Sequence, residues 1–177
     1  MDLSTKRPVR LENRLNNIQE LASISGLESV NTDLIRMFLG EKIGAGGSRS
    51  VYEFNPNPEK YVVKIEPLAT ESNANEFLIW EEVCGLMGNK AWVKDWFAPV
   101  LWMSPDAKVL IMERTTQFMY DKKGQSIPEP RLPAVPDFFM DVKYDNFGYI
   151  GDRLVCHDYG YINRFIHYNK KFRKADW

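Results

Sequence analysis

The 177-residue chain is predicted to adopt an α+β fold in two lobes, with an antiparallel sheet in the first lobe and a strongly reduced second lobe. Three observations predict it. Residues 50–54 and 61–65 have the alternating or β-branched composition of strands, and a turn rich in asparagine and proline separates them. Residues 71–88 have apolar side chains three and four positions apart, as in a helix. Residues 121–136 are rich in proline, which helix interiors and central strands exclude, so we expect the lobes to join there.

Residues 1–40 are predicted to form an N-terminal helical segment. The apolar residues within 10–24 follow one helical stripe. Asn31 or Thr32 would cap a second short helix that ends near Leu39. Packing of the first helix on its own domain is favoured over binding to a partner.

Residues 41–118 are predicted to form the first lobe. A glycine-rich turn lies between its first strands, and the helix of residues 71–88 follows the strand of residues 61–65. Two apolar runs, residues 97–103 and 109–112, flank a proline-containing turn and complete the expected sheet.

Residues 119–136 are predicted to be a proline-rich connector, which is favoured over a ligand for a proline-recognising module because basic residues are scarce among its prolines. Residues 137–177 would form the minimal second lobe. Within it, residues 146–155 are predicted to form a hairpin that turns at Gly151 and Asp152. The basic tail, residues 167–177, is expected to be solvated, and nucleic acid is an unlikely partner.

Composition and charge exclude several classes of function. The net charge of −1 indicates no polyanionic partner. The two cysteines, Cys84 and Cys156, form no CxxC pair, which favours a reducing, cytoplasmic compartment. The N-terminus has no apolar signal segment, and no apolar run approaches the roughly 20 residues that span a bilayer. No membrane role is therefore expected.

The glycine-rich turn is a candidate phosphate site. Gly44, Gly46 and Gly47 lack a Cβ, so a ligand could approach the backbone closely, and successive N–H groups through Ser48 could meet phosphate oxygens. The pattern is neither a dinucleotide fingerprint nor a Walker loop.

Lys64 lies within an apolar strand, where an unpaired ammonium group is costly. We expect Glu76, in the N-terminal half of the following helix, to pair with it. Glu81 and Glu82 of the same helix remain alternatives.

A second polar group follows the connector. Asn146 and Asp158 carry the hard oxygen ligands that magnesium prefers. Lys143 could neutralise charge on a transferring phosphoryl group. Asp141 could orient or deprotonate an attacking hydroxyl.

The order of these motifs, from about Gly44 to Gly160, resembles the protein-kinase-like fold, and most closely the small divergent kinase-like proteins of bacteria and their phages. The resemblance implies that ATP and Mg²⁺ bind in a cleft between two lobes. It implies a phosphate-covering loop in residues 43–52, an adenine-binding hinge through backbone groups of Glu113 and Thr115, a catalytic loop, and a metal-binding Asp-Tyr-Gly. The catalytic loop would contain Asp141, Lys143 and Asn146, and the third-strand lysine and helix glutamate would be Lys64 and Glu76.

The chain departs from the family's pattern in three ways. Arg49 replaces the loop's third glycine, which would alter loop mobility or place a guanidinium near the phosphates. Phe139 and Met140 replace the usual His-Arg, and the substrate-docking segment is missing. Two functions follow as hypotheses: a minimal phosphotransferase that moves the γ-phosphoryl group of ATP to a hydroxyl of a protein or small molecule, or a weakly active or inactive (pseudokinase) module that regulates a partner protein.

Overall fold

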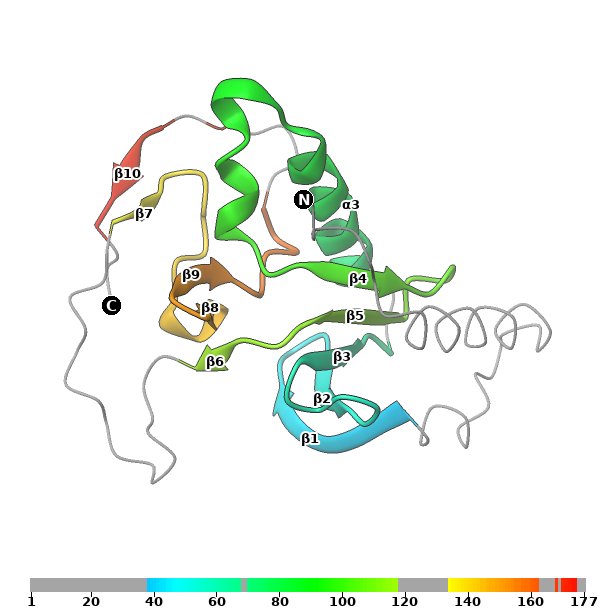
Figure 1. The fold of residues 1–177 in the computed structure, drawn as a ribbon. Coiled ribbons are helices and arrows are strands. Elements are labelled where there is room, and N and C mark those ends of the chain that lie inside the picture. Colours follow the sequence, from blue (N-terminus) through cyan, green and yellow to red (C-terminus); the bar gives the residue numbers. More distant parts are fainter. Residues whose placement is uncertain (1–37, 68–69, 118–133, 163–167, 169, 175–177) are drawn as a thin grey trace, which may run out of the picture.

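The computed structural model describes residues 38–67, 70–117, 134–162, 168 and 170–174, and they form a mixed α+β structure (Figure 1). Its largest element is a five-stranded antiparallel sheet in the order β1-β2-β3-β5-β4. The strands are β1 (Leu39–Ala45), β2 (Ser50–Phe54), β3 (Tyr61–Ile65), β4 (Val100–Met103) and β5 (Val109–Glu113). The predicted antiparallel sheet is therefore confirmed, as is the turn between β4 and β5.

Strand β3 lies at the centre of this sheet and is buried on both faces. Val62 belongs to the main core, whereas Tyr61 and Val63 pack in a smaller cluster on the opposite face. The register pairs Val51 of β2 with Lys64 of β3. Directly opposed side chains point to the same face of a sheet, so Lys64 lies on the side of Val62, towards the main core.

Helix α3 (Ser72–Gly85) lies over that face of the sheet, next to β4 (Figure 1). Its start is held by Glu66, just after β3, whose carboxylate accepts the N–H groups of Ser72 (3.2 Å) and Asn73 (2.8 Å). This carboxylate satisfies two of the N–H groups that a helix leaves unpaired at its first turn. Two short 3₁₀ turns, η1 (Gly88–Lys90) and η2 (Val93–Trp96), lead from α3 to β4.

The remaining strands form two small sheets. β6 (Thr116–Gln117), β8 (Phe147–Ile150) and β9 (Arg153–Cys156) pair in the order β6-β8-β9, and the 3₁₀ turn η3 (Tyr144–Asn146) precedes β8. The β8–β9 hairpin confirms the prediction for residues 146–155, and Gly151 takes a positive φ of 59° at its turn. β7 (Val135–Pro136) pairs with β10 (Phe172–Arg173).

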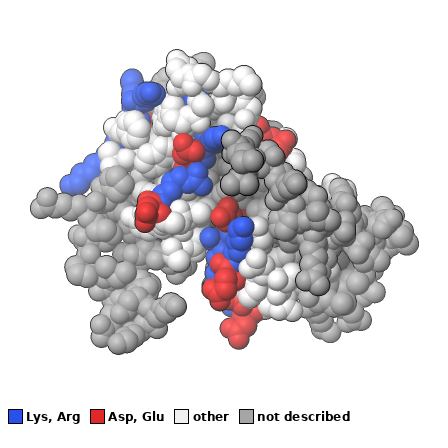
Figure 2. All heavy atoms as spheres, viewed as in Figure 1, with Lys and Arg blue, Asp and Glu red and all other residues white. Residues whose placement is uncertain are grey.

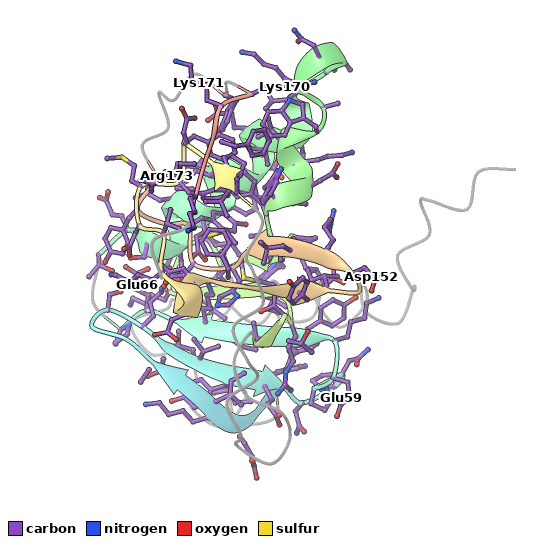
Figure 3. The ribbon with its side chains drawn as sticks, turned by 90° about the vertical axis from the view of Figure 1, so that its left-hand side faces the viewer. Glu59, Glu66, Asp152, Lys170, Lys171 and Arg173 are labelled. Carbon is purple, nitrogen blue, oxygen red and sulfur yellow. The ribbon has the colours of Figure 1, made fainter. Side chains whose placement is uncertain are left out.

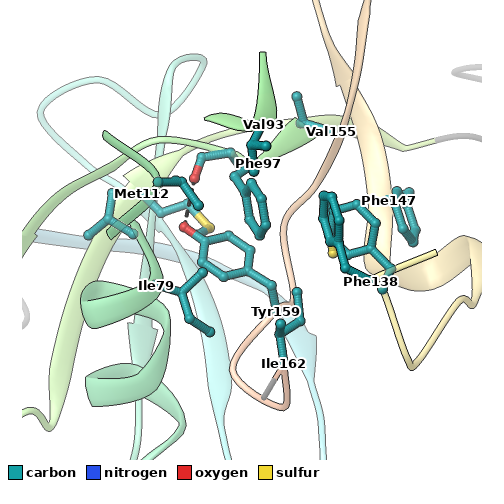
Figure 4. Close-up of a cluster of buried hydrophobic side chains, with 14 of the residues drawn as sticks. Ile79, Val93, Phe97, Met112, Phe138, Phe147, Val155, Tyr159 and Ile162 are labelled. Atoms are coloured by element: carbon teal, nitrogen blue, oxygen red, sulfur yellow. Dashed lines mark hydrogen bonds between the residues drawn. The ribbon is translucent and has the colours of Figure 1, made fainter. Parts of the chain in front are cut away.

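The main core joins α3, η2 and the strands β3, β4, β5, β7, β8 and β9, and aromatic rings form its centre (Figure 4). Phe97 stacks on Phe138 at 6.0 Å and meets Tyr159 edge to face at 4.9 Å. Phe139 packs on Phe97 and on Phe147, each at 5.2 Å. Because Phe138 and Phe139 are buried, they fix the point at which the polar loop after them leaves the core.

Several boundaries differ from the predictions. Strand β1 already begins at Leu39, where a helix end was expected, and the helices predicted within residues 1–37 lie outside the described residues. Residues 116–117, assigned to the predicted first lobe, pair with β8, which was assigned to the predicted second lobe. The connector's last residues form β7, where Pro136 is tolerated because β7 pairs with β10 alone among the described strands.

The basic tail is only partly solvated, which corrects the prediction. Lys170 and Lys171 are exposed, at the end of the molecule far from β1 (Figure 3). Arg173, however, donates to the carbonyl oxygen of Phe139 at 2.5 Å, and the Phe172 ring lies against Trp92 and Trp96. On the face shown in Figure 2, acidic and basic side chains are interspersed among the described residues, without a large area of one sign. Within the described ranges, no helix is long and apolar enough to cross a membrane.

Candidate functional site

The predicted ion pair between β3 and α3 is present. Lys64 Nζ lies 2.9 Å from Glu76 Oε2 and 3.0 Å from Oε1. The pair is buried, with Lys64 4% and Glu76 0% exposed. Glu76 lies on the helix face of Ile79 and Val83, whereas Glu81 is exposed, so the choice of Glu76 among the three glutamates is confirmed.

Glu76 also receives two further donors. Arg49 Nη2 lies 3.0 Å from Oε1, and the backbone N–H of Tyr159 donates to the same oxygen at 3.2 Å. Burial raises the pKa of the Glu76 carboxyl, but the charges of Lys64 and Arg49 outweigh burial, so the pKa lies below its ordinary value. Glu76 is therefore ionised, and its charge holds β2, β3 and the Asp-Tyr-Gly segment together.

Lys64 makes a second contact, which connects the sheet to the Asp-Tyr-Gly segment. Its ammonium group donates to the carbonyl oxygen of His157 at 2.5 Å, immediately before Asp158. The strand lysine, the helix glutamate and the Asp-Tyr-Gly aspartate, which are distant in sequence, thus meet in one place.

Asp158 lies at the open side of this cluster. Its side chain is 40% exposed, and one oxygen, Oδ1, accepts Arg49 Nη2 at 2.5 Å. The following residues are anchored: the Tyr159 hydroxyl donates to Ala98 O at 2.9 Å (Figure 4), and Gly160 lies so close to α3 that a Cβ there would be 2.8 Å from Ser72 O. The glycine is required by this close approach, since any side chain would collide with the backbone.

Asp141, Lys143 and Asn146 contact one another and form a second group. Lys143 Nζ lies 2.9 Å from Asp141 Oδ1, and the Asn146 amide donates to Asp141 Oδ2 at 3.1 Å and to Asp141 O at 2.9 Å. Asn146 is joined to the Asp-Tyr-Gly segment because its carbonyl accepts the N–H groups of His157 and Asp158, at 2.8 and 3.4 Å. The two predicted metal ligands, Asn146 and Asp158, are therefore neighbours.

The glycine turn joins β1 to β2. It is closed by a hydrogen bond from the N–H of Gly46 to the carbonyl of Arg49 at 2.8 Å. A Cβ built on Gly46 or Gly47 would meet no atom within 4 Å, and one on Gly44 would make an ordinary contact with Val51. Packing therefore does not require glycine at positions 46 and 47, and there is open space beside the backbone of both residues. Ser48, the next residue, is half-buried.

The segment predicted as a hinge runs from β5 to β6. The Glu113 N–H donates to Pro99 O at 2.9 Å, and the Arg114 N–H to Lys60 O at 2.7 Å. Arg114 also forms an ion pair with Glu53 of β2 at 2.8 Å. These contacts connect the predicted hinge segment to the five-stranded sheet. A ligand at this segment would have to bind the carbonyl oxygen of Glu113 and the backbone of Thr115.

His157 directly precedes the Asp-Tyr-Gly segment, and no role was predicted for it. Its Nε2 lies 2.9 Å from the carbonyl of Asp145, so Nε2 carries a proton and donates. Its Nδ1 lies 2.8 Å from the Thr115 hydroxyl, which then donates to Nδ1. The neutral ring satisfies both contacts and links the hinge to the loop that carries Asp141.

His157 should make stability depend on pH. Burial, and then the charge of Lys64, lowers its pKa from 6.5 to about 4. The His157 ring is therefore protonated below about pH 6.5 in the unfolded chain, but only below about pH 4 in the folded chain. The free energy of unfolding is expected to fall by roughly 3 kcal/mol as the pH drops across this window.

Chemical denaturation between pH 7 and pH 4.5 would measure this loss. His157→Gln should flatten the curve above pH 5, where Glu76 and Glu66 do not yet titrate. His167→Gln, which changes the chain's other histidine, is the matched control. An unchanged slope in His157→Gln would contradict the assignment.

Among the described histidine, cysteine, aspartate and glutamate residues, no three come together as a ready metal site. Cys84 and Cys156 are free thiols. The models of known protein families and the curated proteins give no match to this chain.

Proposed function

We propose that this chain is a minimal kinase-like phosphotransferase that binds ATP with Mg²⁺ and moves the γ-phosphoryl group to a hydroxyl of a protein or small molecule. The observation that carries the proposal is the buried Lys64–Glu76 pair, whose lysine also contacts the backbone directly before Asp158. A buried lysine held by a carboxylate beside a second, partly exposed carboxylate is an arrangement suited to binding a phosphate chain together with a metal.

The residues have the chemistry that this function needs. Lys64 would bind the α and β phosphates, and the open backbone at Gly46 and Gly47 would allow phosphate oxygens to approach. Asn146 uses its amide nitrogen on Asp141, which leaves its amide oxygen for a cation. Asn146 and Asp158 would hold a magnesium ion, whose chemistry there is to neutralise phosphate charge.

The loop residues would act on the acceptor. Asp141 is exposed, and Lys143 and Asn146 hold its carboxylate in one orientation. Such a carboxylate would orient the acceptor hydroxyl and take its proton. Lys143 is an exposed cation next to this group and would offset charge on the moving phosphoryl group.

A binding module without efficient catalysis is the second candidate. The observation that favours it is Arg49, which already occupies one oxygen of Asp158. A module of this kind would act through its surface on a partner protein, with or without a nucleotide.

The proposal is tested by thermal unfolding with and without MgATP, for the wild type and Asp158→Ala. A ligand present at about a hundredfold excess over Kd adds about 2.7 kcal/mol of stability. For a chain of this size the midpoint should rise by about 5 to 10 °C. Asp158→Ala should fold, because the side chain of Asp158 is partly exposed and Arg49 retains its ion pair with Glu76 in the variant.

A shift in the wild type that vanishes in Asp158→Ala would support the metal–nucleotide site. No shift in either protein would refute nucleotide binding and favour a module that acts without it. An equal shift in both would place the nucleotide away from Asp158.

A further inference from the structure

The contacts of Arg49 in this site were not predicted from the motifs. Arg49 is 7% exposed, and Nη2 of its guanidinium bridges the two carboxylates of the cluster, Glu76 at 3.0 Å and Asp158 at 2.5 Å. The other terminal nitrogen, Nη1, donates to Asn73 Oδ1 at 3.3 Å. The guanidinium therefore lies against the carboxylate that would hold a metal ion.

The sheet register explains this position. Val51 lies opposite Lys64, and side chains alternate between the two faces along β2. Arg49, two residues before Val51, therefore points to the same face as Lys64, under α3. There the amide oxygen of Asn73, at the start of α3, accepts a hydrogen bond from the guanidinium. The amide nitrogen of Asn73 in turn donates to the carbonyl oxygen of Ala107 at 3.0 Å.

The four charged groups that contact one another in this cluster balance without any ligand, and the carboxylate of Glu66 adds negative charge near Arg49. Arg49 and Lys64 are two cations, and Glu76 and Asp158 are two anions. A divalent cation that bound Asp158 alone would displace one ion pair and leave an excess of positive charge beside buried groups, which is costly. A polyphosphate removes this cost, because it brings negative charge of its own and arginine binds phosphate oxygens well.

The contact with Asp158 can be exchanged without unfolding the site. Arg49 would keep Glu76 and Asn73 if it left Asp158, and the Asp158 side chain is exposed enough for water or a metal to replace the guanidinium. The ion pair between Arg49 and Glu76 is buried, whereas the ion pair between Arg49 and Asp158 lies on the solvent-exposed side of the cluster.

We infer that Arg49 is an internal counter-cation, which occupies Asp158 in the free protein and makes metal binding there depend on a polyphosphate ligand. Arg49 then transfers its outer contact from Asp158 to a phosphate oxygen when metal and nucleotide enter together. The identity of the phosphate ligand in this inference rests on the proposed function. The effect of Arg49 on metal binding in the absence of nucleotide does not depend on that function.

The first test measures Mn²⁺ binding without nucleotide, from the electron paramagnetic resonance signal of the free ion. Wild type is expected to bind Mn²⁺ weakly, and Arg49→Gln at least about tenfold more tightly, which is within the usual range of coupling between sites. Arg49→Gln with Asp158→Asn should lose the gain. Equal Mn²⁺ affinity in wild type and Arg49→Gln would overturn the inference.

The second test adds a non-hydrolysable ATP analogue to the wild type. The analogue should raise the Mn²⁺ affinity by at least about tenfold, and this coupling should shrink in Arg49→Gln. An analogue that binds but leaves the Mn²⁺ affinity unchanged would also overturn the inference. If the analogue does not bind, the proposed function fails, and the Mn²⁺ gain in Arg49→Gln still decides the role of Arg49.

A stability control keeps these tests interpretable. Arg49→Gln should fold, because Glu76 retains Lys64 and the Tyr159 N–H. If it does not, Arg49→Lys retains the charge but replaces the planar fork by a single ammonium, which is a poorer bridge. Its Mn²⁺ affinity should then lie above that of the wild type, and a value equal to the wild type would contradict the inference.

Discussion

Replacing Glu76 with glutamine is expected to lower the free energy of unfolding by about 3 to 5 kcal/mol, the usual cost of removing one partner from a buried ion pair. Both Lys64 and Arg49 would lose their buried anion, and the amide of glutamine would place a donor against donors. Chemical denaturation at neutral pH would measure the loss.

Glu81→Gln is the matched control for this variant. Glu81 lies on the exposed side of the same helix, so the change should stay within about 0.5 kcal/mol. A loss below about 1 kcal/mol in Glu76→Gln would mean that the buried cluster contributes little to stability.

The second large effect is expected from Asp141→Asn, which should reduce phosphoryl transfer by at least about a hundredfold and leave MgATP binding intact. Asparagine keeps the shape of Asp141 but cannot accept the proton of an acceptor hydroxyl. The assay uses labelled ATP and measures transfer of the phosphoryl group to the protein itself and to water, which requires no particular acceptor.

Asp145→Asn provides the control for catalysis. Asp145 lies in the same loop and is exposed, and its contact with His157 uses the backbone carbonyl, which the substitution preserves. Equal loss in both variants would indicate a general effect of charge. Binding of MgATP without any transfer in the wild type would favour the regulatory module, and loss of MgATP affinity in Asp141→Asn would assign Asp141 to nucleotide binding.

The two hypotheses of function differ in what Arg49 does after a nucleotide binds. In a phosphotransferase, the guanidinium would move from Asp158 Oδ1 to a phosphate oxygen when the carboxylate holds a metal. In a module without catalysis, the bridge from Arg49 to Asp158 can persist and hold β2 against the Asp-Tyr-Gly segment. The Mn²⁺ experiments therefore bear on the choice between the two functions as well as on Arg49.

Local patterns predicted the strands, the helix and one ion pair. Strands β2 and β3 follow from β-branched residues between strong turns, and helix α3 follows from its apolar spacing. Glu76 could have been chosen on periodicity alone, because it is three residues before Ile79 and seven before Val83, on the buried stripe. These features depend on neighbours within one or two turns of chain, which a sequence displays directly.

Other features followed from no local pattern. Strands β7 and β10 are two residues long and pair across 36 and 38 positions of the chain, so neither has a periodicity of its own. The lowered pKa of His157 depends on burial and on Lys64, which comes from β3, distant in sequence. The basic tail was expected in solvent because the basic run is short and the whole chain is not basic, yet Phe172 and Arg173 pack on residues that are far away in the chain.

The sequence by itself determined which chemical groups this protein has and in what order: a glycine turn, a strand lysine, a helix glutamate and two polar loops. Only the tertiary structure decided how these groups share their charges. The sequence shows Arg49 only as a departure from the loop's glycine pattern, but the register of β2 against β3 turns it inward, where Glu76 and Asp158 balance its charge. The reason is physical: a buried charge must find a partner, and that partner is selected by proximity in space, which the order of residues does not specify.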